Sequence, residues 1–87
     1  MLSLETKQAI IKEFQTKEGD TGSAEVQIAI LTKEIEQLNA HLSYHIHDFA
    51  SKRGLHSKIG QRRSLLKYLE KKDSKRYVAL KQKLNLR

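Results

Sequence analysis

The apolar residues in the middle of the chain recur at a spacing that places them on one side of an α-helix. From Ile28 onward the spacing alternates between three and four residues, which is the period of a helix packed along a single seam. The seam residues are Ile28, Leu31, Ile35, Leu38 and Leu42. The pattern predicts a helix from about Ala24 to about Tyr44, close to 30 Å long at 1.5 Å per residue.

A second long helix is predicted directly after it. The segment His45-Ile46-His47-Asp48 interrupts the pattern, and Asp48 is a plausible N-cap for the following helix. Apolar residues then resume at helical spacing, at Leu55, Ile59, Leu66 and Leu69. Because the connection is short, the two helices should form an antiparallel hairpin in which the second covers the seam of the first.

Two glycines lie inside the second long helix, Gly54 and Gly60. Each costs about 1 kcal/mol relative to alanine in a helix interior. We therefore expect another surface to come close at these turns, either another helix of the protein or a ligand.

Shorter helices are predicted on both sides of the hairpin. Ser3 can cap a first helix that ends near Thr16 to Glu18, and a turn-forming stretch, residues 19–23, follows it. Its apolar residues are Leu4, Ile10, Ile11 and Phe14. Asp73 or Ser74 can cap a last helix whose apolar face is Tyr77, Leu80 and Leu84. With 87 residues the chain supports only a simple core. We expect one all-α domain of four helices over residues 1–87.

Charge divides the chain into two halves. Residues 1–50 carry four Lys or Arg against eight Asp or Glu, whereas residues 51–87 carry thirteen against two. Many of these cations can share the solvated side of the second long helix and its successor. A basic stripe of this kind attracts phosphates, so the sequence predicts a polyanion partner.

The sequence offers little for catalysis or cofactor binding. It has no cysteine, which excludes disulfides and thiolate metal sites, and it has neither a nucleophile-elbow serine nor a P-loop. His41, His45 and His47 lie close together, but a zinc site needs at least three ligands and the third is uncertain here. We expect no enzyme activity, no cofactor and no metal. Charged residues in the first fifteen positions argue against a secretory or membrane segment, so a cytoplasmic location is expected.

The expected hairpin assembles two separate polar clusters, one at each of its ends. At one end Thr21, Gly22 and Gln27 should lie beside Tyr68, and at the other His41 should lie near Asp48 and Ser51. Each cluster includes a helix N-terminus, whose amide groups suit a phosphate. Two separated polar sites fit a folded, branched nucleic acid better than a regular DNA groove.

Two other functions remain open at this point. A DNA-binding helix-turn-helix protein also has basic helices after short turns, and a DNA competitor would separate it from an RNA binder. A protein that dimerises through the seam is the third possibility, and sedimentation would detect the dimer.

Three ordered motifs resemble the family of bacterial small-subunit ribosomal protein number fifteen. They are Asp20-Thr21-Gly22-Ser23-Ala24-Glu25-Val26-Gln27, then His41 with Asp48, Ser51 and Arg53-Gly54-Leu55, then Gln61-Arg62-Arg63-Ser64-Leu65-Leu66-Lys67-Tyr68-Leu69. The resemblance covers the whole chain, including the order of the four helices.

The resemblance implies a ribosomal protein that binds the central domain of small-subunit ribosomal RNA early in assembly and organises the platform. It implies that Thr21, Gly22, Gln27 and Tyr68 face a three-way RNA junction. It also implies that His41, Asp48 and Ser51 read a G·U/G·C element in an adjoining RNA helix. The neighbouring cations Lys52 and Arg53 are expected to contact the same RNA.

One position departs from the family pattern. Ser64 stands where relatives often have an arginine near the junction, so Lys67 or Lys71 is expected to take over that phosphate contact. The resemblance further implies contact with large-subunit RNA at the subunit interface, and with neighbouring platform proteins through the RNA. Some relatives repress their own messenger RNA. The free protein is expected to be a monomer.

Overall fold

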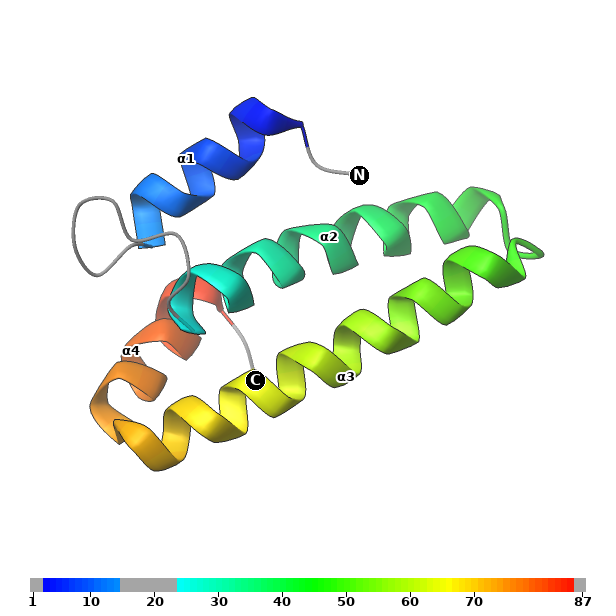
Figure 1. Ribbon diagram of the computed structural model, residues 1–87. Helices are drawn as coiled ribbons and strands as arrows, with labels where there is room; N and C mark the ends of the chain where they lie inside the picture. Colours follow the sequence, from blue (N-terminus) through cyan, green and yellow to red (C-terminus); the bar gives the residue numbers. More distant parts are fainter. Residues whose placement is uncertain (1–2, 15–23, 86–87) are drawn as a thin grey trace.

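The computed structural model describes residues 3–14 and 24–85, and all of their regular secondary structure is helical (Figure 1). The elements are α1 (Leu4–Phe14), α2 (Ala24–Tyr44), α3 (Phe49–Lys72) and α4 (Ser74–Leu84). The expectation of an all-α fold with four helices is confirmed. The expected end of the first helix, Thr16 to Glu18, lies outside the described residues.

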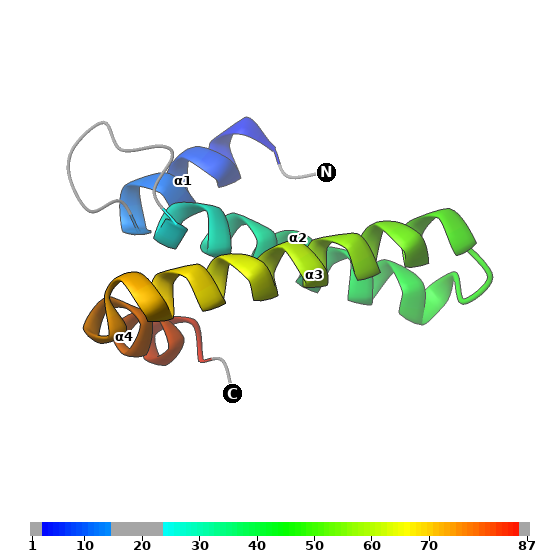
Figure 2. The same ribbon diagram turned by 60° about the horizontal axis from the view of Figure 1, so that its bottom comes forward.

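The antiparallel pair α2 and α3 forms the body of the molecule and has the most extensive packing between any two elements (Figures 1 and 2). Four of the five seam residues of α2 are buried, and Leu42, near the connecting loop, is partly exposed. Two polar contacts also join the helices: Lys58 Nζ lies 3.4 Å from Glu34 Oε1, and Arg62 Nη1 donates to Thr32 Oγ1 over 3.4 Å. The seam is therefore covered within one chain.

The capping predictions are confirmed for three helices. The Ser3 hydroxyl accepts from the Thr6 amide at the start of α1 over 3.1 Å. Asp48 and Asp73 are the N-caps of α3 and α4, and their carboxylates accept from the amides of Ser51 and Arg76 respectively. Asp73 is both the C-cap of α3 and the N-cap of α4, which makes the connection between them very short.

Both short helices lie at the end of the hairpin where α2 begins and α3 ends, and the loop between α2 and α3 projects from the other end (Figures 1 and 2). The core is therefore concentrated at one end. It includes Ile10 and Phe14 of α1, Leu69 of α3 and Leu80 of α4, packed with the first turns of α2. Leu4, expected in the apolar stripe of the first helix, is 72% exposed because α1 contacts α2 through its later turns.

The expectation that Gly54 or Gly60 allows close packing of another helix is wrong for the described residues. A Cβ atom built at either glycine meets no described atom within 4 Å beyond its own helix. Both glycines thus face open space, and the alternative, approach of a ligand, is not tested. Separately, no described helix is long and apolar enough to span a bilayer.

Candidate nucleic-acid interface

The first site lies at the projecting end of the hairpin, where Asp48 joins His41 to Ser51. His41 stands on the last turns of α2, Asp48 caps α3, and Ser51 lies in the first turn of α3. Asp48 Oδ2 is 2.8 Å from His41 Nε2 and accepts from Ser51 Oγ over 2.7 Å, while Oδ1 accepts from the Ser51 amide over 3.1 Å. The sequence-based expectation that these three residues lie together is confirmed.

The hydrogen bonds from Ser51 and His41 hold the pKa of the Asp48 carboxyl well below its usual range, so the group is ionised at neutral pH. An ionised carboxylate only accepts, so both the His41 ring and the Ser51 hydroxyl must donate to it. In a neutral His41 ring, Nδ1 is then an acceptor, as are the remaining lone pairs of the Ser51 oxygen and of Asp48 Oδ1. The site can therefore present hydrogen-bond acceptors to a partner that is rich in donors.

The same Asp48 carboxylate changes our expectation for the start of α3. We expected the free amides of this N-terminus to suit a phosphate. The Ser51 amide already donates to Asp48, and the negative charge of Asp48 opposes an incoming anion. The α3 N-terminus is therefore better suited to a neutral donor than to a phosphate.

Exposed aromatic and apolar side chains surround this site. Tyr44, Ile46 and Phe49 are 86%, 58% and 60% exposed. The His45 ring stacks on that of His41 with centroids 4.6 Å apart, and Lys52 Nζ lies 5.5 Å from the centroid of the Phe49 ring. Arg53 is exposed on the next position of α3. The structure shows no cluster of three or more potential metal ligands within residues 3–14 and 24–85.

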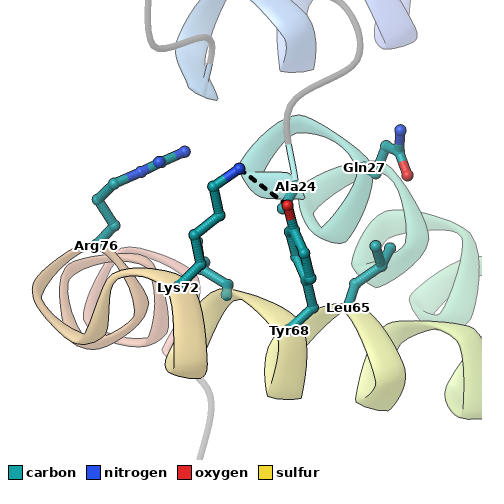
Figure 3. A pocket seen from close by; sticks show the side chains of 7 residues that line it. Ala24, Gln27, Leu65, Tyr68, Lys72 and Arg76 are labelled. Atoms are coloured by element: carbon teal, nitrogen blue, oxygen red, sulfur yellow. Dashed lines mark hydrogen bonds between the residues drawn. The ribbon is translucent and has the colours of Figure 1, made fainter.

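The second site is a pocket at the other end of the hairpin, between the start of α2 and the end of α3 (Figure 3). Its volume is about 310 Å³, and its lining includes Gln27 and Tyr68, as expected from the antiparallel geometry. Lys72 Nζ donates to the Tyr68 hydroxyl over 2.9 Å and lies 5.3 Å from the ring centroid. Thr21 and Gly22, expected here as well, lie outside the described residues.

Sequence reasoning missed two cations of this pocket, Lys72 and Arg76. The position of Lys72, four residues after Tyr68, was a usable signal because residues four apart are neighbours on a helix. Arg76 comes from α4, and no local pattern indicated that α4 folds back toward α2.

The other expected RNA-binding residues lie elsewhere on α3. Ser64 and Lys71 are exposed. Lys67 lines a different pocket, with Arg63 and Tyr77, rather than the one that contains Gln27 and Tyr68. Among the cations of this region, Lys72 is therefore better placed than Lys67 to supply a phosphate contact beside Tyr68.

The two sites are held apart by continuous helix. Gln27 and His41 are both in α2, fourteen residues apart, which corresponds to about 21 Å along the helix axis. Tyr68 and Ser51 are likewise both in α3. The hairpin thus fixes the spacing of the two sites.

Sequence comparison finds relatives along the whole chain. Residues 7–87 match the family described as Ribosomal protein S15. The small ribosomal subunit protein uS15 of Acholeplasma laidlawii is 59% identical over 86 residues, covering 99% of this chain and 97% of the relative. The proteins of the same name from Leuconostoc citreum and Carboxydothermus hydrogenoformans are 58% and 57% identical, with the same coverage. These matches confirm the resemblance that the three motifs indicated.

Proposed function

Because this chain belongs to the ribosomal protein S15 family, a family of structural and non-enzymatic proteins, we propose that it binds the central domain of small-subunit ribosomal RNA at two sites. The observation that carries the proposal is the pair of polar sites at opposite ends of one hairpin. One site would hold a three-way junction, and the other would read a G·U/G·C element in an adjoining RNA helix.

The His41, Asp48 and Ser51 site suits the wide minor groove of an RNA helix. That groove displays the guanine amino group and the ribose 2′-hydroxyls, which are hydrogen-bond donors. Three acceptors at the site, on His41 Nδ1, Ser51 Oγ and Asp48 Oδ1, complement these donors. The 2′-hydroxyls also give the site a means to distinguish RNA from DNA.

The Gln27 and Tyr68 pocket suits an RNA junction. Its aromatic ring and the Gln27 amide can contact an unstacked base, while Lys72 supplies charge for a phosphate. Tyr68 is 52% exposed, so a base can reach it without rearrangement of the core.

The mechanism is scaffolding. A hairpin that engages both sites at once binds only those RNA conformations in which the junction and the G·U/G·C element have the matching spacing. It therefore stabilises the folded junction over the open one by its difference in affinity for the two. Proteins that join the platform later would then meet an RNA surface already in place.

Further partners follow from the same proposal. The exposed Tyr44, Ile46 and Phe49 support contact between the projecting end and large-subunit RNA. Neighbouring platform proteins would be reached through the RNA, and the protein's own messenger RNA would bind if it folds into a similar shape. Because α3 covers the α2 seam, we expect a monomer in solution.

The sharpest test removes the guanine amino group. Inosine lacks this group, so substituting it in the G·U/G·C element should weaken binding of the unaltered protein about tenfold, the loss expected for one hydrogen bond to a charged acceptor. The same substitution should cost the Ser51→Ala and Asp48→Asn variants clearly less. Inosine placed in a paired region outside the element serves as the matched control. An equal loss for all proteins would exclude a base-reading role for this site.

A further inference from the structure

A second basic groove lies on the other side of α3, between that helix and α4. Its volume is about 280 Å³. The cations along it are Arg62, Arg63 and Lys67, and the apolar part of its lining is Ile59, Leu66 and the Tyr77 ring of α4. The third family motif includes Arg62, Arg63 and Lys67, but Lys67 was expected at the junction beside Tyr68. No expected site combined these cations with Tyr77, because that arrangement depends on α4 lying against α3.

The groove is distinct from the Gln27 and Tyr68 pocket. The two share no lining residue. Leu66 lines the groove and Tyr68 lines the pocket. They are two positions apart, a rotation of about 200° around the α3 axis, so they point to nearly opposite sides of the helix. Because α3 itself separates the groove from the pocket, they would bind separate RNA segments.

The charges of the groove favour an anion. Three cations face one carboxylate, that of Glu70. Arg62 also donates to Thr32, whereas Arg63 and Lys67 are both exposed and, within residues 3–14 and 24–85, have neither a hydrogen-bond nor an ion-pair partner. Their charges are therefore available to a ligand.

The aromatic and apolar lining is what separates this groove from a merely solvated basic face. Tyr77 also borders the neighbouring hollow, which contains Val78 and Lys81, and Lys81 Nζ lies 5.3 Å from the centroid of the Tyr77 ring. Val78 is 50% exposed. A row of cations beside an aromatic ring is the arrangement with which proteins bind unpaired nucleic acid, with phosphates on the cations and a base or ribose on the ring.

We propose that this groove binds a second, unpaired RNA segment through Arg63, Lys67 and Tyr77, so that the C-terminal half of α3 lies between two RNA segments. The inference rests on the proposed function, because it assumes that ribosomal RNA is bound at the Gln27 and Tyr68 pocket on the opposite side. Lys67 then has a role in RNA binding, but at this groove rather than at the junction.

The test uses two RNAs and the full-length protein. The first RNA holds only the three-way junction and the G·U/G·C element, and the second is the complete central domain. The Arg63→Gln/Lys67→Gln variant should bind the small RNA as the unaltered protein does, and the complete domain at least tenfold more weakly. Its log-log salt slope on the complete domain should be smaller in magnitude by about 1.4, the value for two phosphate contacts to a single strand.

The matched control is Lys12→Gln/Lys33→Gln, which removes the same charge from exposed positions of α1 and α2. It should lose less than threefold on both RNAs. Equal losses of the groove variant and this control on the complete domain would show a general charge effect and overturn the proposal. An equal loss of the groove variant on both RNAs would overturn it as well, by assigning Arg63 and Lys67 to the junction site.

A variant that is expected to bind more tightly controls for loss of affinity through poor folding. Glu70→Gln removes the one carboxylate of the groove, so it should bind the complete domain about two- to threefold more tightly and leave the small RNA unaffected. Unchanged RNA affinity in all groove variants, with poorer uptake into reconstituted small subunits, would overturn the proposal in favour of an acidic protein partner. Failure of the unaltered protein to bind the small RNA would instead contradict the proposed function.

Discussion

The ion pair between Glu25 and Arg76 joins the first turn of α2 to the first turn of α4, and removing the guanidinium should destabilise the fold. Arg76 Nε and Nη2 donate to the two carboxylate oxygens of Glu25 over 2.6 and 2.5 Å. The Glu25 side chain is only 10% exposed and that of Arg76 is 38% exposed. In Arg76→Met the aliphatic stem remains, and the Glu25 carboxylate stays buried without this partner.

The expected cost lies between two limits. Removing one partner of a fully buried pair costs about 3–5 kcal/mol, whereas an exposed pair contributes about 0–1 kcal/mol. Because water reaches Arg76 but scarcely reaches Glu25, we expect the free energy of unfolding to fall by about 2–3 kcal/mol. For a domain of this size each kcal/mol shifts Tm by about 4–8 °C, so Tm should fall by about 10–20 °C.

Thermal and urea unfolding measure this loss, with Lys75→Met as the control because it removes the same charge from an exposed neighbouring position. The control should change the free energy of unfolding by less than about 0.5 kcal/mol. The double variant Glu25→Leu/Arg76→Met should be more stable than Arg76→Met alone, since it leaves no buried charge. If Arg76→Met is as stable as the control, or the double variant is the least stable of the three, the ion pair does not hold α4 to α2.

Four further predictions concern other elements. Because the pKa of Asp48 is lowered in the folded state, its ionised form stabilises the fold above about pH 4, and this stabilisation is lost as the pH falls further. The difference in free energy of unfolding between the unaltered protein and Asp48→Asn should therefore shrink below that pH, as measured by unfolding at a series of acidic pH values. Gly60→Ala should raise the free energy of unfolding by about 0.5–1 kcal/mol in urea, because a Cβ there meets nothing within 4 Å beyond its own helix; no gain would indicate strain that the structure does not show. Amide hydrogen exchange should be faster in α1 than along the α2 seam, because only Ile10 and Phe14 of α1 are buried; equal protection would contradict weak docking. The logarithm of the affinity for the junction RNA should fall against the logarithm of the salt concentration with a slope near −4 if about five phosphates are neutralised. An affinity that does not change with salt would contradict binding through phosphate contacts.

The sequence predicted the helices well because their signals are local. The bounds of α2 follow from the seam that starts at Ile28, and Asp48 and Asp73 are capping residues whose carboxylates reach amides three positions later in the same segment. The pairing of Gln27 with Tyr68 and of His41 with Asp48 follows once two long helices are joined by a short loop. No contact beyond the hairpin was needed for these inferences.

The remaining features depend on contacts between distant segments, which the sequence pattern does not carry. Glu25 looked like an ordinary first-turn acid, and its pairing with Arg76, 51 positions later, depends on how α4 folds back. Lys67 stands about 100° around α3 from Tyr68 and lines a pocket with Tyr77 of α4, an arrangement that depends on where α4 lies. Leu4 has the hydrophobicity of a core residue, but α1 packs through its later turns.

These contacts between distant segments explain part of the uneven distribution of charge along the chain. Glu25 and Glu34, two carboxylates of the acidic half, pair with Arg76 and Lys58 of the basic half, so part of the acidic charge is used to hold the helices together. Arg63, Lys67 and Lys71 are left exposed on α3. That helix also carries Ser51 near its start and Tyr68 near its end, so one continuous element of 24 residues contributes to both proposed RNA sites. Its partner α2 supplies little of the positive charge but packs along α3. Together the two helices fix the spacing of the two sites, which is the property that would select one arrangement of a branched RNA over the others.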